Sequence, residues 1–323
     1  MSAVLVLVEV VDGTPDRLSL EAVAFARSLT GTVHAAVLGA PGVGAAAADL
    51  GTVGVATAYV AEDARLADYS AAASATALAA VMTAGTFAAV IGPGSERGIE
   101  ILAHVAARRG SAMAANVVGA EPGERWKVTR QRWAGSLLEE AWLDGEPKLL
   151  TVAAHAVGAM EPVAGSGPAA VVAVPVEIPD ADLRARVVGI ETTASDKVSL
   201  AEAKVVVGGG RGLGSAEAFA MLDELAELLG GAVGVSRVAT SLGWRPHAQQ
   251  VGQTGTRIAP DLYIACGISG AIQHIVGCKS AKRILAINTD PDAPIFSRAA
   301  YAVIGDVHQV VPAITAEIRR TQG

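Results

Sequence analysis

Aromatic residues are scarce in this chain: they make up 4% of its 323 residues, against 51% for hydrophobic residues as a whole. The core must therefore be filled by Ala, Val, Leu and Ile. Charged residues are also few, at 18%, so the composition is not that of a disordered protein and a large buried core is feasible. A chain of this length is expected to fold as two domains.

Two further shortages exclude whole classes of function. Cys266 and Cys278 are the only cysteines, too few for a disulfide framework or a four-cysteine zinc site, so we expect two buried thiols. Acidic residues outnumber basic ones, and a net charge of −7 lacks the excess of positive charge that binds the phosphates of DNA or RNA. Nucleic-acid binding is therefore not expected.

No apolar run is long enough to span a bilayer. The longest candidate, residues 77–91, is short and is interrupted by Thr83, Gly85 and Thr86. The first residues carry no basic region and lead directly into a predicted strand, so no targeting segment is predicted. We expect a cytoplasmic protein that is not embedded in a membrane.

The first half of the chain alternates between strand-like and helix-like segments. Continuous aliphatic runs, apolar on both faces, predict interior parallel strands at residues 4–10, 33–38 and 88–91. Apolar residues at helical spacing predict helices at residues 19–29, 70–82 and 96–109. Further strand-like segments follow at residues 126–133, 148–154 and 170–176. This rhythm predicts a doubly wound α/β domain with a parallel sheet.

A second alternating series begins after residue 200. Strands are predicted at residues 204–207, 232–235, 261–266, 283–288 and 301–304, and helices at 215–229, from 269 onward, and at 307–321. The predicted organisation is therefore an N-terminal α/β domain at residues 1–188, a linker at 189–203 and a second doubly wound parallel-sheet domain at 204–323.

Several polar or glycine-rich loops in the second half each follow a predicted strand. They begin at Gly208, Ser236, Gln250, Gly267 and Asn288. Because ligands bind outside the carboxyl ends of strands in an open parallel sheet, loops from several strands point to one shared ligand site.

Taken one at a time, these loops leave alternatives open. The glycines of Gly208-Gly209-Gly210-Arg211-Gly212-Leu213-Gly214 could admit a phosphate, and Arg211 could pair with it, but G-x-G-x-x-G spacing is absent and a tight turn is equally compatible. Arg237 could form a surface ion pair, His274 could be structural, and Ser269 and Asp306 could be helix caps.

Together the loops carry a family resemblance. The segments VVGGGRG, GVSR, QVGQTG, GISGAIQH and AINTDPDAPIF stand in the order and at the approximate spacing found in electron transfer flavoprotein α subunits. The resemblance covers the chain from about residue 204 to its end. It implies a Rossmann-like C-terminal domain that binds FAD, in an electron carrier that turns over no substrate of its own.

The resemblance also implies which residues contact FAD. These are Arg211, Ser236, Arg237, Val251, Gly252, Gln253, Thr254, Ser269, Gly270, Ala271, Ile272, Gln273, His274, Asn288, Asp306 and Val307.

Their implied roles follow the extended cofactor. Arg211 and Arg237 would be cationic neighbours of the flavin, residues 251–254 would line the isoalloxazine with Thr254 near N5, and residues 269–273 would present a helix start to the diphosphate. Asn288 would lie on the ribityl-adenosine side and residues 306–307 at the adenine end. His274 would lie by the pyrimidine end of the ring, where a donor or cation stabilises added negative charge.

Four departures from the family pattern stand out. Thr256 and Thr289 stand where lysine is common, Ser241 stands where aspartate is common, and Gly135-Ser136 replaces a Gly-Asn pair in the N-terminal domain. None of these changes is expected to remove a flavin contact.

The resemblance finally implies partners and two alternatives. The N-terminal domain would pack on an electron transfer flavoprotein β subunit; flavin dehydrogenases, such as the acyl-CoA dehydrogenases of fatty acid β-oxidation, would donate electrons, and a quinone oxidoreductase would accept them. One alternative is an electron-bifurcating flavoprotein with a second FAD in the β subunit. The other is a nucleotide-binding module without redox function, although Gln253, Thr254 and His274 would then have no ring edge to contact.

Overall fold

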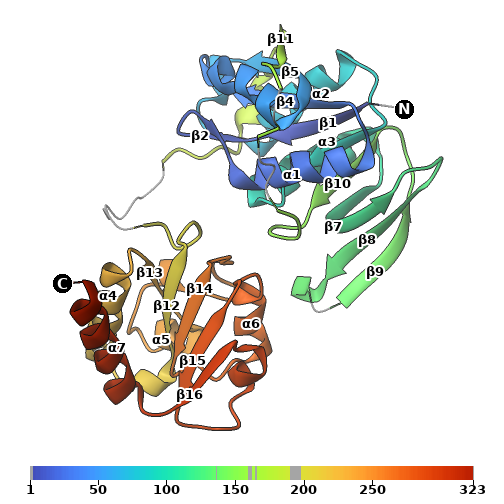
Figure 1. Cartoon of the computed structure of the whole chain (residues 1–323). Coiled ribbons are helices and arrows are strands. Elements are labelled where there is room, and N and C mark those ends of the chain that lie inside the picture. Colours follow the sequence, from blue (N-terminus) through green and yellow to red (C-terminus); the bar gives the residue numbers. More distant parts are fainter. Residues whose placement is uncertain (1–2, 136, 159–161, 164–165, 190–197, 323) are drawn as a thin grey trace. The chain divides into compact units, whose positions relative to one another are not determined.

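The computed structural model describes residues 3–135, 137–158, 162–163, 166–189 and 198–322. The chain divides into two compact units, Met1–Glu191 and Thr192–Gly323, which Figure 1 labels by element. The predicted linker, residues 189–203, spans this division, and its residues 190–197 lie outside the described part. Among the described residues, no helix combines the length and apolar character needed to cross a membrane.

The first unit is built on a nine-stranded sheet with strand order β11-β5-β4-β1-β6-β10-β7-β8-β9. Its strands are β1 (Val4–Val8), β4 (Val33–Gly39), β5 (Val55–Glu62), β6 (Ala89–Gly92), β7 (Met113–Glu121), β8 (Trp126–Arg132), β9 (Leu137–Leu143), β10 (Lys148–Val152) and β11 (Ala170–Ala173). A separate ribbon joins β2 (Val10–Val11) to β3 (Thr14–Pro15). The helices are α1 (Arg17–Leu29), α2 (Ala71–Thr83) and α3 (Glu96–Arg109), with short 3-10 helices η1 (Val43–Ala46), η2 (Ala48–Val53), η3 (Ala64–Leu66), η4 (Trp133–Gly135) and η5 (Asp180–Leu183).

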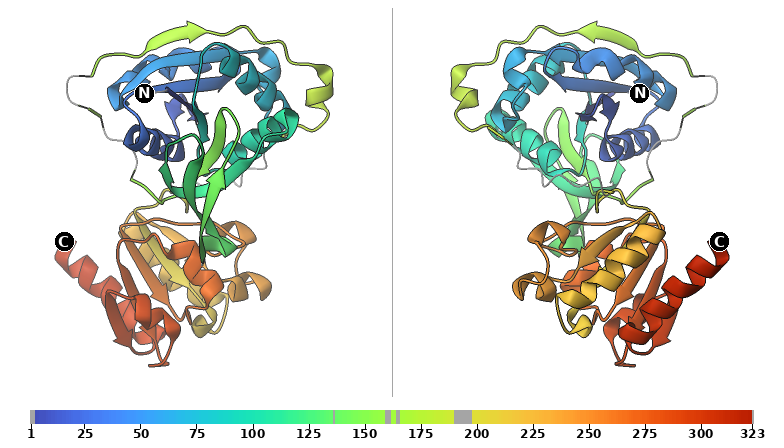
Figure 2. Two further views of the ribbon diagram at one scale, coloured as in Figure 1. Left: turned by 90° about the vertical axis from the view of Figure 1, so that its right-hand side faces the viewer. Right: turned by 90° about the vertical axis from the view of Figure 1, so that its left-hand side faces the viewer.

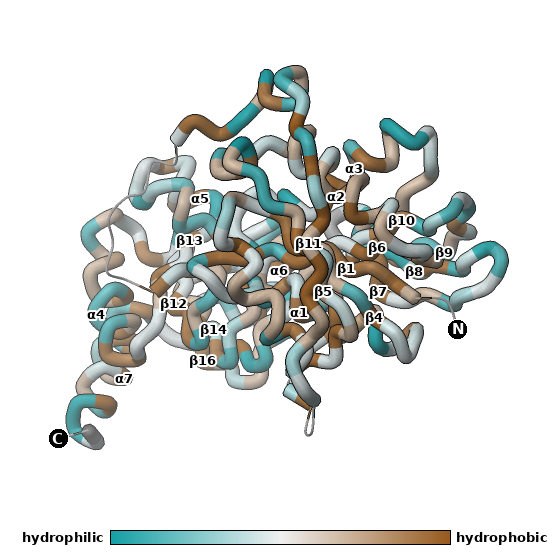
Figure 3. The backbone as a smooth tube through the Cα atoms, turned by 90° about the horizontal axis from the view of Figure 1, so that it is seen from above, coloured by the Kyte–Doolittle hydropathy of each residue, from teal (hydrophilic) through white to brown (hydrophobic). Residues whose placement is uncertain are grey.

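Helices cover both faces of this sheet, as the aliphatic runs predicted. Every residue of β1 is buried, and Figure 3 colours this strand as hydrophobic throughout. Its residues Val4, Val6 and Val8 pack on the α1 side, whereas Leu5 and Leu7 pack against α2 and α3. Apolar side chains on both faces of a strand require helices above and below it, which confirms the doubly wound architecture.

One edge of the sheet departs from the predicted parallel arrangement. All pairings from β11 to β7 are parallel, but β8 runs antiparallel to β7, and β9 antiparallel to β8. The few residues between β8 and β9 allow only a hairpin, because a parallel connection needs a dozen or more. The strands β5, β7 and β9 were not predicted, since alanine, glycine and glutamate weaken their strand signal.

The second unit has five parallel strands in the order β13-β12-β14-β15-β16. They are β12 (Val205–Gly209), β13 (Ala232–Val235), β14 (Leu262–Cys266), β15 (Ile284–Asn288) and β16 (Tyr301–Ile304). The helices are α4 (Ala220–Leu228), α5 (Arg237–Ser241), α6 (Ile272–Cys278) and α7 (Val307–Gln322), with 3-10 helices η6 (Arg211–Leu213), η7 (Glu217–Phe219), η8 (His247–Gln249) and η9 (Pro294–Arg298). Helices α4 and α7 lie side by side on one face, and α6 packs on the other (Figures 1 and 2).

The strand order creates a reversal point between β12 and β14. The chain passes from β12 outward to β13, then returns to the opposite side of β12 for β14, β15 and β16. Loops leaving the carboxyl ends of the two central strands therefore diverge. A crevice between such loops is the usual ligand site of an open α/β sheet.

Two predicted helices begin later than expected. Helix α4 starts at Ala220, after the 3-10 turn η7, whereas the prediction began at residue 215. Helix α6 starts at Ile272 instead of residue 269. The reason is Gly270, whose φ of +82° is left-handed, in a turn where Ile295 N–H donates to the carbonyl of Ser269 at 3.0 Å.

The central strands of the first unit make a stability prediction. Replacing the fully buried Leu149 of β10 by Ala should lower the free energy of unfolding by roughly 2–5 kcal/mol, because it leaves a cavity between the sheet and the helices. Leu138→Ala on β9 is the matched control: its side chain is 67% exposed, so its effect should stay within about 0.5 kcal/mol. Urea unfolding of the two variants measures the difference, and equal losses would contradict this account of the core.

Candidate functional site

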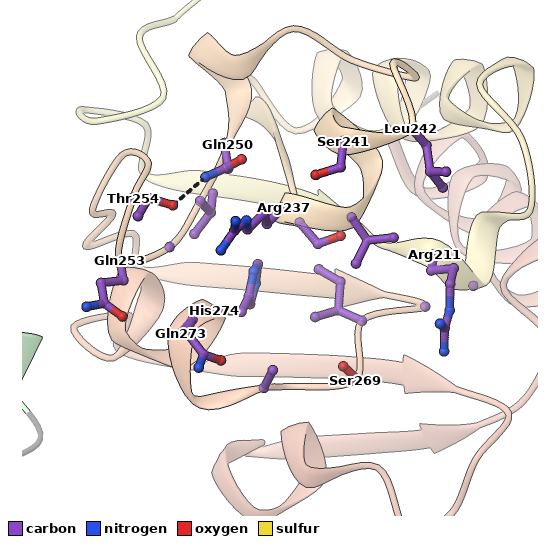
Figure 4. Close-up of a pocket in the computed structure, with 18 of the residues that line it drawn as sticks. Arg211, Arg237, Ser241, Leu242, Gln250, Gln253, Thr254, Ser269, Gln273 and His274 are labelled. Carbon is purple, nitrogen blue, oxygen red and sulfur yellow. Dashed lines mark hydrogen bonds between the residues drawn. The ribbon is translucent and has the colours of Figure 1, made fainter.

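A pocket of about 650 Å³ lies at the carboxyl edge of the second sheet (Figure 4). The loops after β12, β13, β14 and β15 contribute to it, together with the first turn of α6 and the segment at residues 250–254. Its lining residues are Arg211, Gly212, Ser236, Arg237, Val238, Ser241, Leu242, Gln250, Val251, Gly252, Gln253, Thr254, Gly267, Ile268, Ser269, Ala271, Gln273, His274, Asn288 and Asp290.

Glycines bring the loops after β12 and β14 into backbone contact. Gly210 N–H donates to the carbonyl of Cys266, and Gly212 N–H donates to that of Gly267, both at 3.0 Å. A Cβ at Gly210, Gly212 or Gly267 would meet the backbone of the other loop. These glycines therefore provide close packing between the two loops, which is neither of the two interpretations left open for this segment.

Two arginines bring positive charge to the pocket. Arg211 follows β12 and Arg237 follows β13, and Figure 4 shows Arg237 extending into the pocket while Arg211 stands at the end opposite Gln253. Both are exposed, and within the described residues neither forms an ion pair. Their charge is therefore available to a ligand that carries negative charge.

The segment at residues 250–254 is anchored on both sides. Val251 N–H donates to the carbonyl of Val235 in β13 at 2.9 Å, and Gln253 N–H donates to that of Gln273 in α6 at 2.8 Å. The φ of Gly252 is +149°, and a Cβ there would press on the carbonyl of Gln273. These contacts hold the side chains of Gln253 and Thr254 at the rim of the pocket (Figure 4).

His274 is held as a neutral side chain. It is 7% exposed, and burial lowers its pKa to about 4. Its Nε2 lies 2.7 Å from the hydroxyl of the fully buried Tyr263, and the two rings stack with centroids 6.0 Å apart. At neutral pH His274 can serve as a hydrogen-bond donor. Of the two roles predicted for this side chain, donor or cation, the lowered pKa favours the neutral donor.

Two buried polar atoms of the pocket residues make no hydrogen bond of ordinary geometry in the described part of the protein: Ser236 Oγ and His274 Nδ1. The backbone of Val251 lies near enough to offset part of the shift in the His274 pKa, but the geometry falls short of a hydrogen bond. Buried polar atoms normally have partners, so their presence beside a pocket fits a ligand rich in hydrogen-bonding atoms.

Comparison with known proteins identifies the family of the chain. Residues 199–279 match the model of the electron transfer flavoprotein FAD-binding domain, and residues 4–179 match that of the electron transfer flavoprotein domain. The chain is 40% identical to electron transfer flavoprotein subunit alpha of Mycobacterium leprae, with 100% of both chains covered.

This chain belongs to the electron transfer flavoprotein family, among its alpha subunits. It is also 38% identical to the alpha subunit of Paracoccus denitrificans, over 98% of this chain and 100% of that protein. The corresponding protein of Bacillus subtilis is 35% identical over 98% and 97% of the two chains. The family resemblance seen in the sequence is thereby confirmed, and FAD is the cofactor of the domain.

The structure brings most of the predicted FAD-binding residues together around one pocket. Four of them do not line it. Gly270 serves the turn described above, and Ile272 is 71% exposed at the first position of α6. Asp306 accepts a hydrogen bond from His308 N–H at 2.9 Å and so caps α7, and Val307 is buried in the core beneath that helix.

The pocket also contains residues that the predicted set lacked. Gln250, Ser241 and Leu242 line it, as do Val238 and Asp290. Gln250 stands in the polar segment that directed attention to Thr254, so its side chain was a visible candidate. Ser241 and Leu242 could not be found from local pattern, because a helix after β13 carries them to the site. The departure from the family pattern at Ser241 therefore lies in the lining of this pocket.

The lowered pKa of His274 predicts a pH-dependent stability. In the unfolded chain His274 takes up a proton below its ordinary pKa of 6.5, but the folded chain resists protonation until about pH 4. Above pH 6.5 this group therefore leaves the free energy of unfolding unchanged. As the pH falls from 6.5 toward 4, the free energy of unfolding decreases by roughly 3 kcal/mol.

A His274→Gln variant should lack this loss. Urea unfolding at pH 7 and pH 4.5 measures the stability of the two proteins, each used as purified. If both lost stability equally over this range, His274 would not be the neutral buried group described here.

Proposed function

We propose that this chain is the FAD-binding subunit of a heterodimeric electron carrier in the cytoplasm. It pairs through its N-terminal α/β unit with an electron transfer flavoprotein β subunit. It receives electrons from flavin dehydrogenases, such as acyl-CoA dehydrogenases, and passes them to a quinone oxidoreductase. The observation that carries the proposal is the pocket between the loops of β12 and β14, with two arginines and two buried polar atoms that have no partner within the described part of the chain.

The polarity of the pocket suits a cofactor that becomes more negative. When bound, FAD supplies the redox chemistry through its isoalloxazine ring, which takes up and releases electrons. Arg237 and Arg211 offer positive charge, and His274 and Thr254 offer neutral donors. Donors and cations held in place before negative charge arrives stabilise that charge without rearrangement. These residues would therefore favour electron uptake.

The ionisable groups at the site support a carrier without substrate turnover. Among the described lining residues they are Arg211, Arg237, His274 and Asp290. With its pKa lowered to about 4, His274 would be only a weak general base near neutral pH. Burial raises the pKa of the Cys266 thiol to about 12, which removes it as a nucleophile. The residues thus bind and tune a cofactor.

An extended FAD would follow the carboxyl edge of the sheet. Residues 251–254 line the pocket, and so does Asn288, the last residue of β15. Gly305 N–H donates to the carbonyl of Asn288 at 3.0 Å, so Asp306, which follows the neighbouring strand β16, lies along the same edge. The isoalloxazine would lie by residues 251–254, and the adenine would reach Asp306 and Val307.

The visible spectrum of the chain co-expressed with its β subunit tests this proposal. We expect a two-band flavin spectrum, and stepwise chemical reduction that proceeds through two separate one-electron stages. A flavin that goes directly to its fully reduced form and oxidises NADH would instead indicate an electron-bifurcating protein. A colourless complex that retains a nucleotide would overturn the proposal in favour of a module without redox function.

Arg237 provides a mutational prediction. Arg237→Gln should weaken FAD binding by roughly tenfold to a hundredfold, because hydrogen bonds and charge pairing to an ionised group contribute about 1.5–3 kcal/mol. The control is Arg298→Gln, which removes an exposed arginine of the same unit from η9, outside the pocket. FAD dissociation is followed by flavin fluorescence, and equal retention in the two variants would show that Arg237 does not contact the cofactor.

A further inference from the structure

Gln250 is a buried amide in the wall of the pocket. Its side chain is 2% exposed, and its backbone N–H and carbonyl bond to His247 and Thr256 at 2.8 and 2.7 Å. The side-chain amide bridges two threonines: Thr240 on α5 and Thr254 at the pocket rim. Figure 4 marks the bond to Thr254. The position of the Thr254 hydroxyl is therefore set from behind by Gln250.

The two distances decide which way the amide faces. Thr240 Oγ1 lies 2.6 Å from one amide atom of Gln250, a length usual for O–H···O bonds but short for N–H···O. Thr254 Oγ1 lies 3.0 Å from the other amide atom, the usual length of an N–H···O bond. The amide oxygen therefore faces Thr240 and the amide nitrogen faces Thr254. The Thr240 hydroxyl also lies 2.9 Å from the carbonyl of Arg237, a second acceptor for the same proton.

This arrangement determines what Thr254 can do. Its oxygen accepts a hydrogen from the Gln250 amide, so its own proton is not used in that contact. Thr254 is exposed and lines the pocket, and its proton is free to be donated to an acceptor there. A carboxylate in place of the amide would reverse this, because it could only accept from Thr254.

We propose that Gln250 is a positioning residue that holds Thr254 as a hydrogen-bond donor toward acceptor atoms of the isoalloxazine ring. The inference rests on the proposed function and deepens it, since it names a residue that acts on FAD through another side chain. A donor presented to the ring stabilises the negative charge of the first added electron. Gln250 would therefore raise the affinity of the bound flavin for that electron.

Gln250→Glu tests the proposal, because glutamate has the shape of glutamine and turns the donor into an acceptor. FAD-loaded heterodimers would be titrated with dithionite, a one-electron reductant, and the potential of the first step measured. We expect the equilibrium constant for uptake of the first electron to fall at least roughly tenfold, which equals about 59 mV.

A negative charge alone would lower the potential, so two further variants separate the causes. Ser241→Asp adds a carboxylate to the same pocket without touching Thr254, and it measures the effect of charge. Thr254→Val removes the hydroxyl. In the Thr254→Val background, Gln250→Glu should change the potential no more than Ser241→Asp does, which is the non-additivity expected of coupled residues.

Equal effects of Gln250→Glu in the presence and absence of the Thr254 hydroxyl would overturn the proposal, and so would an effect no larger than that of Ser241→Asp. Both outcomes leave a flavin-loaded wild type and the proposed function intact. A wild-type heterodimer without flavin would overturn the proposed function, and this inference with it.

Discussion

The backbone contact between the loops after β12 and β14 is the constraint on which the site depends. Gly210 and Gly212 donate to the carbonyls of Cys266 and Gly267, and no side chain fits between the two loops. This contact closes the crevice at the reversal point of the sheet and forms the base of the pocket. It also determines where Arg211 and Ser269 emerge, because each leaves the contact within two residues.

The electrostatic character of the pocket follows from unequal burial around this base. The arginines are exposed, so water solvates their charge, whereas His274 lies deeper, where burial keeps it neutral. The deep layer therefore contributes orientation through Tyr263 and Gln250, and the rim contributes charge. Together they present donors to a ligand whose ring edge carries acceptors.

The predictions that succeeded relied on one geometric regularity. Ser236, Ser269 and Asn288 each follow a parallel strand, and parallel strands end at a common edge, so sequence alone could indicate that they gather. The predictions that failed needed other information. Helix α6 begins late because Gly270 contacts Ile295, a residue 25 positions further on, and the antiparallel strands β8 and β9 extend a sheet whose core strands are parallel.

The sequence by itself determined the two-part α/β plan, the family and the cofactor. Hydrophobic periodicity and loop motifs are local properties, so they can be read directly from the order of the residues. Only the tertiary structure decided that Gly210 and Gly212 pack against the loop after β14, that His274 is neutral beside Tyr263, and that Gln250 faces Thr254 with its nitrogen. Burial and the direction of a hydrogen bond depend on atoms that other strands and helices bring near, and no local pattern records them.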